Sequence, residues 1–189
     1  MAILNIGGFD PSMKNFGLVK AKLDMDEGYL SDLELSLVQT SVDTKNKKVL
    51  RKNVQDFERA QKLFKETSAF FEGLDVICVE LPVGSQSAAA MKSYGVCIAL
   101  TAALNIPIIY VTATEVKLAG HGTKNATKQQ MIDWVVNEYP ELPWLRYKKH
   151  GVMVLNSANE HLADAIAALH AGVQTDQFEI YKRLYTGTK

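Results

Sequence analysis

Residues 3–19 read ILNIGGFDPSMKNFGLV, and the architecture of the chain can be inferred from this segment. Residues 3–9 are apolar or small and are followed by Asp10, a pattern typical of a buried strand that ends in an acid. Pro11 and Asn15 bound a segment that favours a tight turn. From residue 16 to residue 23, apolar side chains alternate with polar or small ones, which predicts a second, antiparallel strand.

The remaining sequence extends this pair into a larger sheet. Residues 32–39 alternate in the same way and predict the third strand of an antiparallel meander. Compact apolar runs at 75–81 and 106–111 predict two buried strands. Helices are expected at residues 53–71, 85–104, 127–138 and 157–174, and a further short helix is expected to begin at 112–116 and to be broken at 120–122. Residues 139–156 contain prolines and other breakers and are expected to be irregular. The chain is therefore expected to be an α/β protein with a mixed five-stranded sheet covered by helices on both faces.

Composition indicates a globular protein without a global charge signal. A chain of 189 residues that is 47% hydrophobic can bury a full core but is short for two domains, so residues 1–189 are interpreted as one domain. Lys plus Arg and Asp plus Glu number 21 each, so nucleic-acid binding would require local basic patches. Cys78 and Cys97 lie in apolar runs, which favours buried, reduced thiols. We find no signal peptide or membrane-length apolar run and expect a cytoplasmic protein.

Three acids occupy positions that suggest chemistry. Asp10 follows the first strand, Glu80 ends the apolar run VICVE, and Asp164 lies among alanines and leucines of the last helix. A buried, unpaired carboxylate is unfavourable, which favours a functional role for Glu80 and Asp164. Asp10 is explained equally well as a turn residue before Pro11. His161, three residues before Asp164, can share its helix face.

Carboxylates without a cysteine partner suit Mg²⁺ or Mn²⁺ better than a structural zinc ion. Two such ions, about 3.5 to 4 Å apart, can activate a water and stabilise the leaving oxygen in phosphodiester hydrolysis. His161 can ligate a metal or transfer a proton near neutral pH. Glu160 also shares a helix face with Asp164 and is an alternative to His161, although it can equally be a favourable charge at the helix start.

Four segments, in order along the chain, resemble the motifs of the RuvC Holliday junction resolvases. They are IGGFDPSMKNFGLV (6–19), VICVELPVGSQSAAAMKSYGVCIAL (76–100), VTATEVKLAGHGTKNATKQQMIDWV (111–135) and EHLADAIAALHAGV (160–173). The resemblance implies a ribonuclease H-like fold and a homodimer that acts on branched DNA such as a four-way junction. It also implies magnesium-dependent hydrolysis, with Mn²⁺ as a substitute, that leaves a 5′-phosphate.

The resemblance assigns roles residue by residue. The catalytic and metal-binding residues of this endodeoxyribonuclease would be Asp10, Glu80, His161 and Asp164. Lys117 and Lys128 would contact DNA phosphates. Many members carry an aromatic wedge shortly after the second acid, where this chain reads LPVG at residues 81–84. The resemblance therefore leaves open whether flaps and other branched DNA are cut as readily as four-way junctions.

Basic residues supply candidate DNA contacts. Arg146, Lys148 and Lys149 lie near Trp144 and Tyr147, whose rings can stack on an unpaired base while the cations bind the backbone. A further DNA contact is expected at Lys124. A second cluster is equally explained as a solvated loop. It consists of Lys45, Lys47, Lys48, Arg51 and Lys52.

Two other functions are compatible with parts of the sequence. A non-catalytic branched-DNA-binding protein of the same fold would not need the acids that are present at every motif position. A sugar-kinase or actin-like ATPase also carries an aspartate and a glycine near its N-terminus. That fold needs a duplicated domain with a second phosphate loop, which we do not find in 189 residues.

Overall fold

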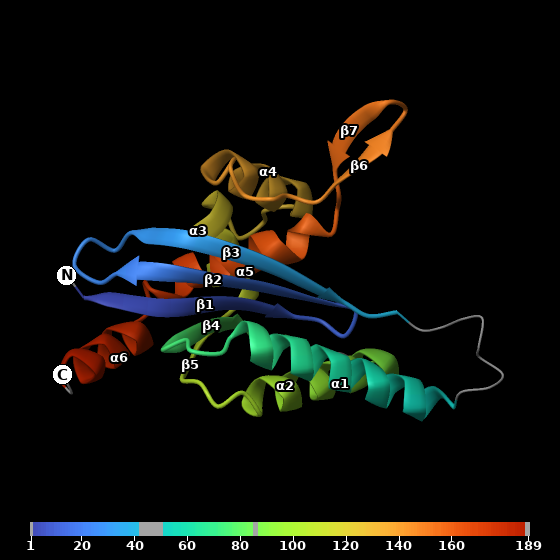
Figure 1. Cartoon of the computed structure of the whole chain (residues 1–189), viewed down its shortest axis with the longest axis horizontal. Helices are drawn as coiled ribbons and strands as arrows, with labels where there is room; N and C mark the ends of the chain where they lie inside the picture. Colours follow the sequence, from blue (N-terminus) through green and yellow to red (C-terminus); the bar gives the residue numbers. More distant parts are fainter. Residues whose placement is uncertain (1, 42–50, 85–86, 188–189) are drawn as a thin grey trace.

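The computed structural model describes residues 2–41, 51–84 and 87–187. Its main sheet has five strands in the order β3-β2-β1-β4-β5 (Figure 1). The strands are β1 (Ile3–Pro11), β2 (Asn15–Asp24), β3 (Leu30–Gln39), β4 (Val76–Glu80) and β5 (Ile108–Val111). The first three pair antiparallel, whereas β4 pairs parallel with β1 and β5 pairs parallel with β4. The predicted mixed sheet is confirmed.

Helices cover both faces of this sheet, as predicted (Figure 1). On one face lie α1 (Lys52–Phe70) and α2 (Ala88–Ala102). Their core contains edge-to-face contacts of Phe9 with Phe16 and Phe71. The opposite face carries α3 (Ala113–His121), α4 (Lys128–Glu138) and α5 (Asn159–Gly172). No helix in the described part of the chain is long and apolar enough to cross a membrane.

Helix α5 lies directly against β1 and β2 because glycines replace side chains at the contact. A Cβ atom on Gly8 would overlap the carbonyl oxygen of Ala165, and one on Gly17 would overlap the carbonyl oxygen of His161. Backbone atoms in a packed interior cannot yield to an added methyl group without moving the helix. These two glycines therefore set the distance between the sheet and the first turns of α5.

The two cysteines are buried and free, as predicted. Cys78 lies beneath α5, where a Cβ on Gly172 would overlap its sulfur atom. Burial raises the pKa of the Cys78 thiol to about 12. Burial also raises the pKa of Cys97, to about 11. Such thiols are protonated near neutral pH and act as small apolar core residues.

The prediction that residues 139–156 are irregular is wrong. They contain an antiparallel hairpin of β6 (Arg146–Lys149) and β7 (Val152–Leu155). His150 and Gly151 connect the strands with φ angles of 48° and 86°, and two positive φ angles are characteristic of a tight hairpin turn. Strands of four residues, one of them largely basic, gave no clear alternation in the sequence.

One helix prediction is confirmed and another needs correction. Helix α3 was expected to begin at 112–116 and to be broken at 120–122; it runs from Ala113 to His121, and Gly122 ends it in the left-handed conformation. The helix predicted at 157–174 is not the last one, because α6 (Asp176–Gly187) follows it. Thr175 lies between the two helices. Its hydroxyl accepts a hydrogen bond from the backbone N–H of Phe178, in the first turn of α6, at 3.1 Å.

Candidate active site

The parallel pairing of β1 with β4 brings two of the predicted acids side by side. Phe9 is the register partner of Val79, so the next residues, Asp10 and Glu80, are neighbours at the carboxyl ends of their strands. Residues two apart on a strand share a face, and Gly8 and Cys78 both face α5. Asp10 and Glu80 therefore point to the face that α5 covers.

Helix α5 supplies the other two residues. His161 and Asp164 are one turn apart near its start. The His161 Nδ1–H donates to Asp10 Oδ2 over 2.6 Å, and the two side chains are only 15% and 16% exposed. The structure thus brings His161 onto Asp10, an acid 151 residues earlier in the chain.

Asn15 completes this arrangement and was not predicted as a site residue. Its Nδ2 lies 3.0 Å from His161 Nε2, opposite the Asp10 contact, and its Oδ1 accepts a hydrogen bond from Gln39 Nε2 at 3.0 Å. Donation from Asn15 to Nε2 requires the neutral ring with its proton on Nδ1. The sequence showed Asn15 only as a turn residue, because its partner lies 146 residues away.

The pKa values of the two remaining carboxyl groups are both raised in the metal-free chain. Burial raises the pKa of Glu80 to about 8, and the charges of Asp10 and Asp164 raise it further than the charge of Lys117 lowers it. Burial also raises the pKa of Asp164 to about 7, assisted by Asp10 and opposed by His161. The mutual influence of these groups places them in one electrostatic unit.

The pKa of the His161 ring is raised. Burial acts in the opposite direction, but the hydrogen bond and charge of Asp10, together with Glu160 and Asp164, outweigh it. Glu160 Oε1 lies 3.5 Å from Nε2. If Nε2 were protonated, its N–H would face the NH2 group of Asn15, and two donors would meet. The Asn15 amide would then have to rotate and present its oxygen to the ring. The Asn15 amide is thus coupled to the charge of His161.

Two predicted DNA-binding lysines border the acids. Lys117 lies close enough to Glu80 for its charge to lower the pKa of that carboxyl group. Lys128 Nζ pairs with Glu160 Oε1 at 2.7 Å, and its side chain is 79% exposed. A surface ion pair of this kind contributes little to stability, so Lys128 can exchange Glu160 for a phosphate at small cost. Lys124 is exposed between α3 and α4.

The donor set fits a hard divalent cation, but the metal site is not preformed. Among the described residues, no three His, Cys, Asp or Glu groups have a geometry that could hold a metal ion. The nearby carboxylates of Asp10, Glu80 and Asp164 nevertheless offer hard oxygen ligands whose mutual repulsion a cation would relieve. Metal binding here would require these side chains to move closer together.

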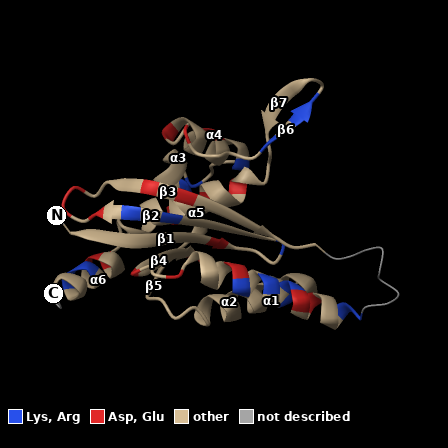
Figure 2. Ribbon diagram, viewed as in Figure 1, with Lys and Arg blue, Asp and Glu red and all other residues tan. Residues whose placement is uncertain are grey.

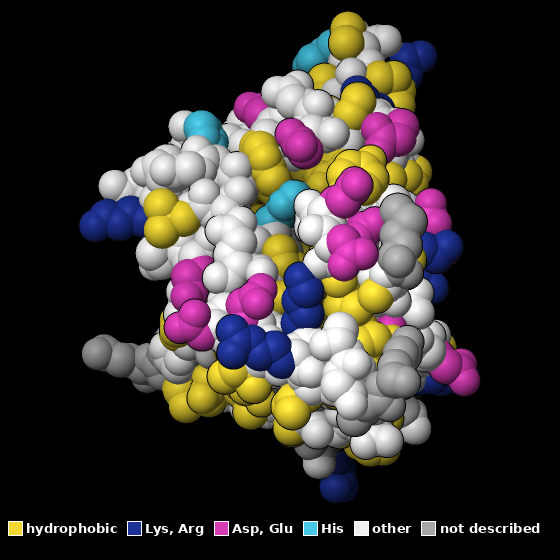
Figure 3. Space-filling model, turned by 90° about the vertical axis from the view of Figure 1, so that its left-hand side faces the viewer, with side chains coloured by type: hydrophobic (Ala, Val, Ile, Leu, Met, Phe, Trp, Pro, Cys, Tyr) yellow, Lys and Arg dark blue, Asp and Glu magenta, His cyan; other side chains and the backbone are white. Residues whose placement is uncertain are grey.

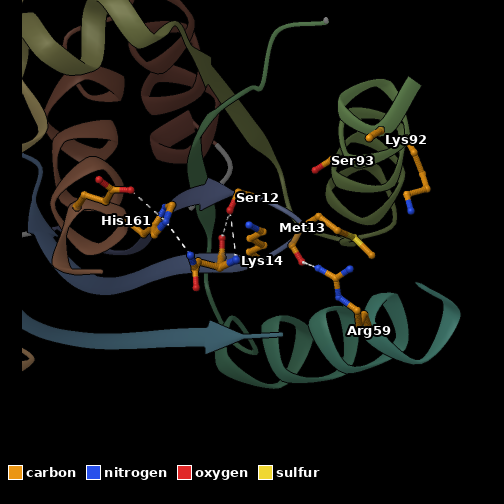
Figure 4. Close-up of a pocket in the computed structure, with 10 residues that line it drawn as sticks. Ser12, Met13, Lys14, Arg59, Lys92, Ser93 and His161 are labelled. Carbon is orange, nitrogen blue, oxygen red and sulfur yellow. Dashed lines mark hydrogen bonds and ion pairs between the residues drawn. The ribbon is translucent and has the colours of Figure 1, made fainter. Parts of the chain in front are cut away.

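A groove of about 490 Å³ opens beside His161 (Figure 4). It lies between the β1–β2 turn, α1, α2 and the start of α5. Lys14, Arg59 and Lys92 line it together with Glu160, and Arg59 and Lys92 both pair with Asp56, at 3.6 and 2.6 Å. Arg59 also donates to the Met13 carbonyl at 2.8 Å, so it holds the turn that follows Asp10. The groove thus presents cations beside the candidate site, and their charge is partly neutralised within the chain.

The other predicted basic cluster lies on the hairpin. Arg146, Lys148 and Lys149 are exposed on β6, which is coloured as basic in Figure 2. By contrast, acidic and basic side chains are interspersed on the end of the molecule shown in Figure 3. The prediction that Trp144 stacks on a base is wrong: this ring is buried, and its Nε1–H donates to the Tyr139 carbonyl.

The remaining basic cluster lies only partly in the described structure. Arg51 precedes α1 and Lys52 begins it. Three of the lysines lie outside the described residues: Lys45, Lys47 and Lys48.

Comparison with known proteins identifies the fold. No protein-family model matches the chain, and no curated protein matches its sequence. Thermus thermophilus RuvC bound to a Holliday junction substrate is similar, with a TM-score of 0.58, 17% identity and coverage of 89% of this chain and 92% of that one. A second structure of T. thermophilus RuvC has a TM-score of 0.55, 18% identity and 98% coverage of both chains.

The yeast mitochondrial Holliday junction resolvase Ydc2 is also similar. Its TM-score is 0.52 and its identity 12%, with coverage of 95% of this chain and 85% of that chain. At these identities the similarity establishes the fold. The ribonuclease H-like fold of the RuvC-type resolvases, expected from the motifs, is confirmed.

Proposed function

We propose that this chain is a divalent-metal-dependent endonuclease that cleaves branched DNA, with the four-way junction as its main substrate. The observation that carries the proposal is the meeting of three acids and a histidine from β1, β4 and α5 beside a groove lined by Lys14, Arg59 and Lys92. The group consists of Asp10, Glu80, His161 and Asp164. The similarity in fold to proteins described as Holliday junction resolvases supports the choice of substrate.

We assign the carboxylates of Asp10, Glu80 and Asp164 to metal binding, with His161 as a fourth candidate and Glu160 as its alternative. Bound Mg²⁺, or Mn²⁺ in its place, would supply water activation and stabilise the leaving oxygen, giving a 5′-phosphate product. In the metal-free chain, Asp10 and Asn15 orient the His161 ring through its two nitrogens. That ring can hold or release a proton at the end of the groove.

The proposed DNA contacts surround this centre. Lys117 and Lys128 would bind phosphates near the cleaved bond, which is supported by their interactions with Glu80 and with Glu160. Lys124 and the cations of the hairpin would extend the contact along the substrate. Each phosphate contact releases counterions, so binding should weaken as salt increases.

We further propose that residues 1–189 act as one domain in a homodimer formed through α1 and α2. Three apolar side chains on these helices are exposed: Val54 at 37%, Phe57 at 65% and Met91 at 43%. A second copy of the same face could cover them in a self-complementary interface. Light scattering should therefore give twice the monomer mass, and Phe57→Ser should shift it toward the monomer. The cytoplasmic location stays a prediction.

Cleavage of labelled DNA tests the proposed activity. Four-way, three-way, flap and linear DNA should be compared under the same conditions with Mg²⁺, Mn²⁺ or EDTA. We expect paired symmetric nicks in the four-way junction, little cleavage of linear duplex and none in EDTA. Glu80→Gln should abolish the nicks, whereas Glu179→Gln, which removes the same charge from exposed α6, should leave them unchanged. Equal cleavage by both variants would contradict the proposal.

A second candidate is a non-catalytic branched-DNA-binding protein of the same fold. It is favoured by one observation, the absence of a ready metal-binding geometry among the described residues. This candidate predicts tight binding of four-way junctions without cleavage in either Mg²⁺ or Mn²⁺. Calorimetric titration with Mn²⁺ separates the candidates further, because the nuclease should bind the ion and Glu80→Gln should weaken that binding.

A further inference from the structure

The β6–β7 hairpin stands clear of the sheet and of the helices around it (Figure 1). The segment that contains it, residues 142–159, has no Asp or Glu, whereas β6 carries Arg146, Lys148 and Lys149. Apolar side chains are exposed beside these cations, with Val152 at 64% and Met153 at 55%. A two-stranded hairpin buries too little surface to be stable alone, so this one depends on how its base is attached.

The strand register places cations on both faces of the hairpin. Arg146 pairs with Leu155 and Lys148 pairs with Met153, so these four side chains share one face. On the other face, Lys149 lies opposite Val152. Each face therefore combines a positive charge with an apolar side chain.

Asn159 attaches the base of the hairpin to the helix of the candidate site. Its side chain is fully buried, accepts a hydrogen bond from the Leu145 N–H at 3.0 Å and donates to the Leu145 carbonyl at 2.9 Å. The Asn156 N–H donates to the same carbonyl at 2.9 Å. Because Asn159 lies two residues before His161 on α5, the hairpin and the site are held by one short segment.

We propose that the hairpin is an arm that enters the major groove of the duplex next to the cleaved bond, and that Asn159 fixes the distance between arm and site. This inference rests on the proposed action on branched DNA. A two-stranded ribbon fits the major groove, which is about 12 Å wide, and not the minor groove at about 6 Å. Cations on both faces can reach the phosphates on both walls of the groove.

The apolar side chains of the arm also suit this location. Val152 and Met153 can contact base edges, where the thymine methyl group is the apolar feature of the major groove. A second copy of the hairpin is a poorer partner, because it would bring like charges together with no acid in residues 142–159 to compensate. The charge pattern thus selects DNA as the occupant.

Binding measurements test the arm separately from catalysis. Affinity for a four-way junction should be measured in EDTA over a range of salt concentrations. For a triple variant with Arg146, Lys148 and Lys149 changed to Gln, we expect the slope of log K against log salt to fall by about 2 to 3 units, near 0.9 for each lost phosphate contact. A control triple variant with Lys22, Lys65 and Arg183 changed to Gln should keep the wild-type slope.

The readout for groove choice is methylation interference. Methylation of guanine N7 lies in the major groove and should block binding at a cluster of positions for the wild type, and this cluster should disappear when residues 147–154 are replaced with Asn-Gly, which removes the arm. Interference only from adenine N3, in the minor groove, would overturn the major-groove assignment. An unchanged salt slope in the triple arm variant would overturn the arm itself.

Asn159 is a positioning residue, so its test is where the DNA is cut. Asn159→Ala should distribute cleavage over several neighbouring bonds, whereas unchanged cut positions would contradict the role. Should that variant fail to fold, replacing residues 147–154 with Asn-Gly keeps the Leu145 contacts and removes the arm, and the same spread of cuts is expected. If the wild-type protein bound the junction without cleaving it, the proposed nuclease activity would be rejected, and the salt-dependence measurement would still decide whether the hairpin is an arm. If the wild-type protein did not bind the junction, both proposals would be rejected.

Discussion

The site beneath α5 and the β6–β7 hairpin differ in almost every physical property. The site is built from half-buried acids that alter one another's pKa values, and glycines hold its helix against the sheet. The hairpin is exposed, basic and attached through one buried asparagine. The comparison suggests a division of roles: close packing positions the groups that cleave the DNA, and exposed charge binds it.

The largest expected effect is a loss of cleavage without a loss of DNA binding. Asp164→Asn removes one carboxylate of the group but no exposed cation. We expect single-turnover cleavage to fall by about 10³-fold or more, because a metal ligand is lost, while junction affinity in EDTA changes less than about twofold. The triple arm variant should show the reverse balance, with the larger loss in affinity. Equal losses of affinity in both variants would remove the division of roles.

The second prediction concerns the packing of the site. Gly17→Ala places a methyl group against the His161 carbonyl and should lower the free energy of unfolding by about 1 to 3 kcal/mol. Gly95→Ala in α2 is the matched control, since its Cβ meets no atom within 4 Å in this chain. It should be neutral or slightly stabilising in urea unfolding. Similar destabilisation of both variants would argue against close packing as the special feature of the site.

The third prediction uses the raised pKa values of Glu80 and Asp164. An acid whose pKa is raised in the folded state contributes its full stabilisation at pH values below its unfolded-state pKa. This contribution is lost as the pH rises through the folded-state pKa. For Glu80 the pKa interval runs from the ordinary value of 4.5 to about 8, and for Asp164 from 3.8 to about 7. The metal-free protein should therefore lose stability between about pH 5 and pH 8, by about 1 to 3 kcal/mol.

Thermal unfolding across this pH range measures the loss. Glu80→Gln should flatten the profile, because the amide does not ionise, and Glu179→Gln should not. Mg²⁺ should raise Tm more at pH 8 than at pH 6, since protons compete with the cation for the same oxygens. A wild-type profile that rises from pH 5 to pH 8 would contradict the raised pKa values.

The sequence predicted those features that depend on local patterns. Alternating and apolar runs gave the five strands, and the costly position of Glu80 in VICVE suggested a functional carboxylate. The sequence could not show that Trp144 is buried, because its burial depends on the hydrogen bond to Tyr139 and on packing by distant helices. The hairpin was missed because its four-residue strands show no clear alternation and because the contact of Asn159 with Leu145 at its base joins residues 14 positions apart.

The contact between Asn15 and His161 was also beyond a local pattern, and it gives the smallest predicted effect. Asn15→Ala removes the donor that stabilises the neutral ring, so the pKa of His161, already raised, should rise further. We expect a loss of cleavage of about tenfold, with unchanged affinity in EDTA, because the ring loses one of its two orienting contacts. NMR titration of the ring should show the direction of the shift. Gln39→Ala, one hydrogen bond further away, should produce the same changes at smaller size, and a larger effect from Gln39 than from Asn15 would contradict this order.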